Sequence, residues 1–112
     1  MTKEQIEDYK ILVEAEGGHW HDNKRILGGV MVCSQCPKDV LKSPLDNPDF
    51  SQWSNFGRLL KIGQKNKHKS HTISAVNLLM RVALKLSIKK ITIDEIPNYL
   101  AHEIAEVLRK EA

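Results

Sequence analysis

The chain has 112 residues, of which 41% are hydrophobic and 28% are charged, and it carries a formal net charge of +3. This size and composition are ordinary for one globular domain with one modest core, so we expect a single domain over residues 1–112. No apolar run reaches the roughly 18 residues that a membrane helix needs, and the first ten residues, MTKEQIEDYK, are charged where a signal peptide would be apolar. We therefore expect a soluble, cytoplasmic protein with no membrane partner.

The charge is strongly segregated along the chain. Residues 1–49 carry six basic and nine acidic side chains, and residues 94–112 carry two and five. Residues 50–93 carry nine basic side chains and no acid, although composition alone would place about five or six acids there. This acid-free stretch either forms a basic surface that attracts a polyanion or an acidic protein, or it is neutralised by pairing with the acidic flanks.

The first predicted helix covers residues 3–16. Thr2 and Gln5 have the spacing of a capping box, and the apolar positions that follow have helical spacing: Ile6, Tyr9, Leu12 and Val13. Gly17 and Gly18 supply a stop signal, because glycine tolerates the positive φ that often ends a helix. The apolar run at 26–33, interrupted by two glycines, then predicts one or two short strands, and three prolines make 36–49 a loop.

Three more helices are predicted in the second half of the chain. The second is capped by Ser51, ends near residues 63–66, and buries Trp53 and Phe56 with Leu59, Leu60 and Ile62. The third is opened by Ser70 or Thr72, and its expected buried stripe is Ile73, Val76, Leu79, Val82, Ala83 and Leu86.

The last predicted helix begins near Thr92 or Asp94, because Pro97 is accepted only in a first turn. Its apolar stripe is Ile96, Leu100, Ile104, Val107 and Leu108. The expected fold class is therefore mainly α (α+β), with about four amphipathic helices and a small strand or knuckle element around residues 26–36.

Two cysteines and two histidines form the sharpest candidate site. Cys33 and Cys36 make a CxxC turn, and His19 and His21 lie upstream, so the four together form a candidate zinc tetrahedron. A single CxxC is also compatible with two packed, unmetallated cysteines or with redox chemistry, although Pro37 and the loop after it argue against a thioredoxin-like motif. Zinc is the one cofactor that the sequence brings into consideration.

Catalytic chemistry is not expected. The sequence contains no recognisable Ser/His/Asp set, phosphate-binding glycine loop or nucleophile elbow. His102 and Glu103 lack the second histidine of an HExxH motif, so we interpret them as ordinary helix surface, and residues 68–71 as a solvated loop. We therefore expect a non-enzymatic protein.

The basic residues are the candidate binding site for a partner. These are Arg58, Lys61, Lys65, Lys67, Lys69, Lys89 and Lys90. The leading interpretation is a small binding protein that contacts a polyanion, expected to be a nucleic acid, through phosphates without strong sequence readout, because the third helix is too apolar to read a groove. Docking on an acidic protein surface and a zinc-binding module are the alternatives.

Residues 47–60, NPDFSQWSNFGRLL, resemble a segment of small uncharacterised phage-encoded proteins, in which a Pro-Asp-aromatic turn leads into a helix. Residues 91–97, ITIDEIP, are similar in style to the C-terminal helices of such proteins. The two segments cover about a fifth of the chain, and the short 67–71 connection leaves no room for the hairpin of phage sandwich-type domains. The resemblance implies a phage or prophage accessory protein that modulates a host protein, a class that includes inhibitors of host defence.

Overall fold

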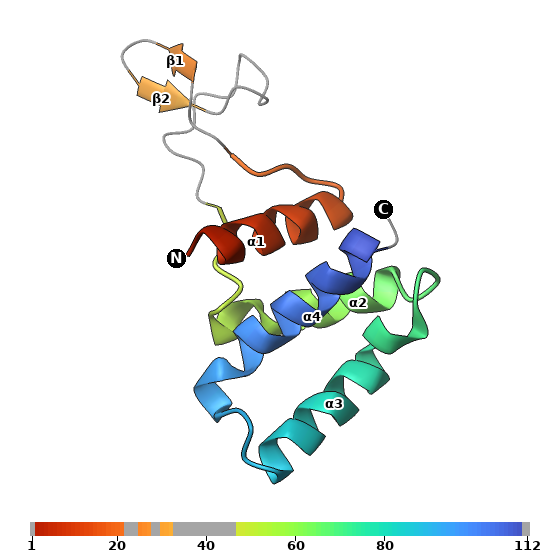
Figure 1. Ribbon diagram of the computed structural model, residues 1–112. Helices are drawn as coiled ribbons and strands as arrows, with labels where there is room; N and C mark the ends of the chain where they lie inside the picture. The colour runs from red at the N-terminus through yellow and green to blue at the C-terminus, as the bar shows by residue number, and fades with distance from the viewer. Residues whose placement is uncertain (1, 22–24, 28–29, 33–46, 111–112) are drawn as a thin grey trace.

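The protein is a bundle of four helices with a small hairpin, as seen in a computed structural model that describes residues 2–21, 25–27, 30–32 and 47–110 (Figure 1). The α-helices are α1 (Lys3–Ala15), α2 (Phe56–Lys65), α3 (Ala75–Ser87) and α4 (Ile96–Lys110). Strands β1 (Arg25–Leu27) and β2 (Val30–Val32) pair antiparallel, with Ile26 opposite Met31. The predicted mainly helical fold with a small strand element is confirmed, while residues 33–36 of the predicted knuckle lie outside the described residues.

The first helix begins and ends as the sequence predicts. The Thr2 side chain accepts a hydrogen bond from the backbone N–H of Gln5, and the Gln5 side chain accepts one from the backbone N–H of Thr2. These two bonds satisfy donors that have no partner within the helix. Gly17 follows the helix with φ +94°, a conformation that glycine adopts without the steric cost that a Cβ would add.

The predicted start of the second helix is wrong. Ser51 does not cap it; the Ser51 hydroxyl and backbone N–H both bind the carboxylate of Asp49, forming a turn. A 3-10 turn, η1 (Trp53–Asn55), then leads into α2 at Phe56. The local side-chain bond to Asp49 therefore competes successfully with the expected cap.

Helices α3 and α4 are each introduced by a 3-10 turn. Ser70 caps η2 (His71–Ile73), and Ser74 rather than Ser70 or Thr72 caps α3 itself. Thr92 and Glu95 form a capping box around η3 (Ile93–Glu95), which continues directly into α4. Pro97 lies in the first turn of α4, as predicted.

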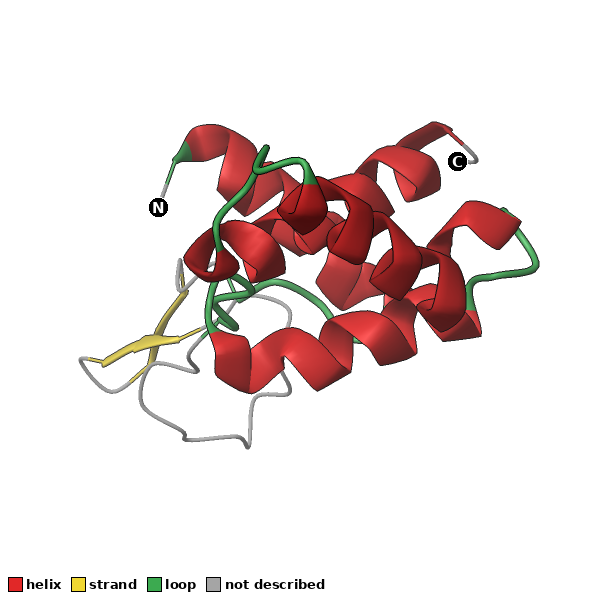
Figure 2. Ribbon diagram, turned by 90° about the horizontal axis from the view of Figure 1, so that it is seen from below, coloured by secondary structure: helices red, strands yellow, loops and turns green. Residues whose placement is uncertain are grey.

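Helix α4 is the central element and contacts each of the other three helices. Helices α1, α2 and α4 run side by side with their C-terminal ends at the same end of the bundle, and α3 returns in the opposite sense (Figure 1). Figure 2 shows the same bundle from below, with the hairpin at one side of it. The α2–α3 turn therefore lies near the C-terminal ends of α1 and α4.

The core is aliphatic around one aromatic pair. Tyr9 and Phe50 are fully buried and meet edge to face, with ring centroids 5.4 Å apart. The Tyr9 hydroxyl donates to Oδ1 of Asn98 at 2.7 Å, which ties α1 to α4, and burial raises the pKa of Tyr9 to about 12. Each fully buried aliphatic residue contributes about 1.5–3 kcal/mol of hydrophobic free energy. Such residues are Leu12, Leu59, Ile73, Leu78, Leu100 and Ile104.

One glycine sets the distance between α2 and the start of the third helical segment. A Cβ on Gly63 would lie 2.3 Å from the backbone oxygen of Ile73 and 2.8 Å from Cδ1 of Leu78. Real side chains do not approach a backbone atom that closely, so the close contact requires glycine at this position.

The predicted buried stripe of the third helix is partly wrong. Ile73 and Val82 are buried, and Leu86 is half-buried against the core. Val76, Leu79 and Ala83 are exposed, because Leu78 and Val82 face the bundle and the opposite side of α3 faces outward. The predicted core role of Trp53 is also wrong, since Trp53 is 44% exposed, and its ring is tilted against that of the half-buried Phe56.

Candidate functional site

The two arginines of the acid-free stretch pair with carboxylates from the acidic flanks. Nε of Arg58 lies 2.7 Å from both carboxylate oxygens of Glu16, and its guanidinium lies 5.4 Å from the centre of the Phe50 ring. Nη1 of Arg81 lies 2.8 Å from Oε2 of Glu103. These two cations therefore link α2 to the end of α1 and α3 to α4, respectively.

The seven lysines of the same stretch behave differently. None of them forms an ion pair with a carboxylate within the described part of the chain. All but Lys85 are exposed. The acidic flanks thus neutralise the arginines of the acid-free stretch and leave its lysine charge facing solvent. The seven are Lys61, Lys65, Lys67, Lys69, Lys85, Lys89 and Lys90.

Six of the seven lysines form two groups at opposite ends of α3, and Lys85 lies on α3 itself. One group, called here the lysine corner, consists of Lys61 and Lys65 on one face of α2 and of Lys67 and Lys69 in the following turn. The other group, which contains Lys89 and Lys90, follows α3. A helix of 13 residues is about 20 Å long, so the predicted basic surface is two patches and not one.

An apolar surface separates these two patches. Five large side chains on and just after α3 are 46–66% exposed, and the exposed Ala83 lies among them. They recur three and four residues apart, which places them on one side of the helix. We call this surface the α3 face. It consists of Val76, Leu79, Met80, Ala83, Leu84 and Ile88.

A cluster of charged groups that sequence reasoning missed joins α1 to α4. The Asp8 side chain is 9% exposed, and its carboxylate accepts hydrogen bonds of 2.9 Å from Nδ1 of His102 and from Nη2 of Arg109. The hydrogen bond to Asp8 raises the pKa of His102 above its ordinary value. The sequence signal was the 4-residue spacing of His102 and Glu106 on α4 together with an acid next to Tyr9 on the inner face of α1.

Asp8, His102 and Glu106 approach one another closely enough to share a cation. Arg109 already supplies a positive charge there, because its guanidinium binds the carboxylates of both Asp8 and Glu106. We therefore describe the group as an ion-paired seam between two helices. His102 is exposed, as predicted for helix surface, but its ring has this structural partner.

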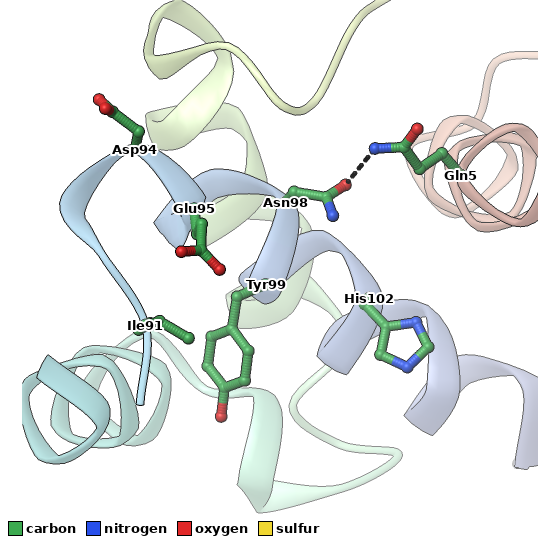
Figure 3. A pocket seen from close by; sticks show the side chains of 7 residues that line it. All are labelled: Gln5, Ile91, Asp94, Glu95, Asn98, Tyr99 and His102. Carbon is green, nitrogen blue, oxygen red and sulfur yellow. Dashed lines mark hydrogen bonds between the residues drawn. The ribbon is translucent and has the colours of Figure 1, made fainter. Parts of the chain in front are cut away.

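A groove of about 420 Å³ lies between the N-terminal part of α1 and the start of α4 (Figure 3). Asn98 points toward Gln5 and accepts a hydrogen bond from it at 3.2 Å, in addition to the bond from Tyr9. Glu95 caps the backbone N–H of Thr92, and His102 is bound to Asp8. Four of its polar side chains, Gln5, Glu95, Asn98 and His102, therefore serve helix capping and helix pairing.

The predicted zinc ligands are only partly within the described residues. The rings of His19 and His21 lie edge to face with centroids 4.7 Å apart, so these two side chains do come together. The backbone N–H of His21 donates to Oδ1 of Asn47, and Nδ2 of Asn47 donates back to the His21 carbonyl. Cys33 and Cys36 lie outside the described residues, so the zinc site stays a prediction.

Among the helices of the described residues, none is both long and apolar enough to cross a bilayer. Comparison with protein-family models, with curated proteins and with solved structures gave no match to this chain.

Proposed function

We propose that this protein is a non-enzymatic binding protein that contacts the phosphate backbone of a nucleic acid through the lysine corner. The observation that supports the proposal is a contrast within one acid-free stretch: its arginines pair with carboxylates, whereas its lysines have no carboxylate partner among the described residues. A lysine without a carboxylate partner can release counterions when it meets a phosphate, which is the main source of sequence-independent affinity.

The corner concentrates its charge over a short distance. Four lysines fall within nine residues, and Glu16, which shares a groove with Lys61 and Lys65, is held by Arg58. The buried Asn66 fixes the turn, because its side chain donates to the carbonyl of Ile62 at 2.8 Å. A turn held in this way presents Lys65, Lys67 and Lys69 from a defined backbone.

The proposed mode is contact with phosphates and not with base edges. Trp53, the exposed tryptophan of the described residues, lies at the opposite end of α2 from the corner, so it is not placed to stack a base there. The outer side of α3 is apolar and offers no row of polar side chains to base edges. Binding should therefore depend on salt and hardly on sequence.

Fluorescence anisotropy with labelled duplex DNA of arbitrary sequence tests the proposal. If four phosphates are contacted, raising the salt from about 50 to about 200 mM should weaken binding by about a hundredfold. Lys65→Gln with Lys69→Gln should lower the slope of log affinity against log salt by about two. Absent binding, or binding that salt does not change, would falsify the proposal.

Matched controls exist on α1, where Lys3 and Lys10 are exposed lysines outside the acid-free stretch. Lys3→Gln with Lys10→Gln removes the same charge as the corner variant and should leave the salt slope unchanged. An equal loss in both double variants would mean that net charge, and not the lysine corner, governs binding.

A further inference from the structure

Helix α3 is apolar on both of its sides. Leu78 and Val82 face α2 and α4 and are buried, whereas Val76, Met80 and Leu84 point outward and are 59–66% exposed. Where a helix has apolar residues on two opposite sides, both sides are normally covered. In the part of the chain that the structure describes, the α3 face is left uncovered.

The α3 face carries no charge of its own. The charged residues of α3 are Arg81 and Lys85, and the 100° step between residues places both on its flank, away from Val76 and Ala83. Arg81 is held there by Glu103. A contiguous exposed apolar surface of this kind marks an interaction site more often than a solvated helix.

A groove of about 640 Å³ runs along one edge of the face. Met80 and Leu84 form its apolar wall, and the remaining lining residues are polar: His71, Thr72, Asn77 and Arg81. A second helix can pack against an apolar ridge beside a groove. The side chains of the second helix then fill the groove, and its ridge contacts Met80 and Leu84. The occupant that fits this shape is a helix.

The charges around the face decide what kind of helix fits. Among the described residues, lysines without a carboxylate partner lie before α3, at Lys67, and after it, at Lys89 and Lys90, whereas Lys69 lines a groove with α1 and α4. A second copy of the chain, docked face to face in either direction, would bring lysines against lysines. A partner helix with acidic residues at its ends would instead bring opposite charges together at both ends of the apolar contact.

We propose that the α3 face binds an amphipathic helix of another protein, one whose apolar stripe is flanked at both ends by acidic side chains. Apolar contacts with Val76, Met80 and Leu84 supply the affinity, and the lysines at the two ends fix the position of the partner helix along α3. This surface shares Lys67 with the lysine corner but makes no use of phosphate binding.

The test uses a synthetic amphipathic helical peptide with glutamates at both ends of its leucine stripe, and a second peptide with lysines in place of the glutamates. The acidic peptide should bind at least about tenfold more tightly than the basic one. Met80→Ser with Leu84→Ser should weaken binding by at least about tenfold, because each change removes an exposed apolar contact. Trp53→Ser is the matched control, since Trp53 is exposed but lies off α3.

Both substituted side chains are largely exposed, so the double variant should keep its helical circular dichroism and melting temperature. If it does not, Val76→Ser, at a side chain 66% exposed, supplies a second test of the same face. Equal binding of the two peptides, or an equal loss in Trp53→Ser, would overturn the proposal.

Two other occupants of the face are distinguished by parallel measurements. A concentration-dependent dimer in sedimentation equilibrium that Met80→Ser with Leu84→Ser abolishes would identify a second copy and overturn the proposal. Binding to phosphatidylserine vesicles that the same variant abolishes would identify a lipid surface and would also overturn it. A monomer that ignores vesicles and binds the acidic peptide supports it.

Discussion

At the residue scale, Asp8 is a buried carboxylate whose charge is balanced from two turns of the neighbouring helix. His102 and Arg109 both reach it from α4, seven residues apart, so the pair spans about two helical turns. A buried carboxylate without such partners would carry a desolvation cost of several kcal/mol. The cluster therefore fixes α1 against α4 at a defined register.

This cluster predicts a pH dependence of stability. The pKa of folded His102 is raised, so its contribution is fully present below its ordinary pKa of about 6.5 and is lost as the pH rises through the raised value. His102→Gln should therefore lower the melting temperature more near pH 5.5, where His102 is protonated in the folded protein, than near pH 8.5. The exposed His68, substituted by Gln, is the control, and a pH-independent effect of His102→Gln would contradict this account.

Gly63 predicts a large effect of one methyl group. Gly63→Ala places a Cβ 2.3 Å from the Ile73 backbone oxygen, so the segment around η2 must move away from α2. Overpacking of this kind costs about 1–3 kcal/mol, which corresponds to a fall of roughly 5–15 °C in melting temperature for a domain of this size.

The matched control for Gly63 is a second glycine on the same helix. A Cβ at Gly57 meets nothing within 4 Å, so Gly57→Ala should be neutral or stabilising by up to about 1 kcal/mol. Thermal denaturation of the two variants compares them directly. Similar melting temperatures would show that α2 and η2 are not in the close contact described.

The zinc prediction belongs to the same scale. His19 and His21 stand together, and His21 is hydrogen-bonded to Asn47, so the chain returns to these histidines after the segment that contains both cysteines. If the four residues hold zinc, protein purified without a metal-affinity tag should carry about one equivalent, and Cys33→Ser with Cys36→Ser should carry none. Native mass spectrometry measures this, and a metal-free wild-type chain would refute the zinc site.

At the element scale, α3 ends on a residue in an unusual conformation. Lys89 has φ 56°, and the two closing hydrogen bonds run from the Lys90 N–H to the Lys85 carbonyl and from the Lys89 N–H to the Leu86 carbonyl. This is a Schellman ending, in which the left-handed position is usually glycine. Helix α3 therefore ends at Lys89 in a left-handed conformation that has a steric cost for any residue with a Cβ.

This ending predicts a stabilising substitution. Lys89→Gly removes the steric cost of the left-handed conformation and should raise the free energy of unfolding by about 1 kcal/mol. Lys90→Gly, at a position without positive φ, should not stabilise the protein. Urea denaturation measures both, and equal effects in the two variants would argue against strain at Lys89.

At the scale of the whole molecule, the acid-free stretch (residues 50–93) contributes two lysine patches and one exposed apolar surface, the α3 face. Its two arginines form ion pairs that hold the helices together, and its lysines lie at the two ends of α3. Most of its apolar residues lie in the core or on the α3 face, whereas Trp53 and Ile93 are exposed elsewhere. The same 44 residues therefore place exposed lysines and exposed apolar side chains on different parts of the protein surface.

This separation predicts independent losses in the two proposed activities. Lys65→Gln with Lys69→Gln should weaken binding to duplex DNA and change binding to the acidic peptide by less than about threefold, whereas Met80→Ser with Leu84→Ser should do the reverse. Titrations of each variant with each ligand measure the four affinities. Parallel losses of both ligands in one variant would show that the two surfaces are one site.

The sequence by itself determined the elements whose signals are local. The Thr2 capping box, the stop at Gly17 and the position of Pro97 each depend on neighbouring residues, so the bounds of α1 and the start of α4 could be predicted. The segregation of charge was equally visible, because it is a property of the order of residues.

Only the tertiary structure decided which sides of the helices are buried and which charges are paired. Helix α3 carries apolar residues on two opposite sides, so its periodicity could not show that Leu78 faces inward while Val76 and Leu79 face solvent. The pairing of Arg58 with Glu16 and of Asp8 with His102 joins residues 42 and 94 positions apart. Such contacts depend on how whole helices pack, and no local pattern specifies them.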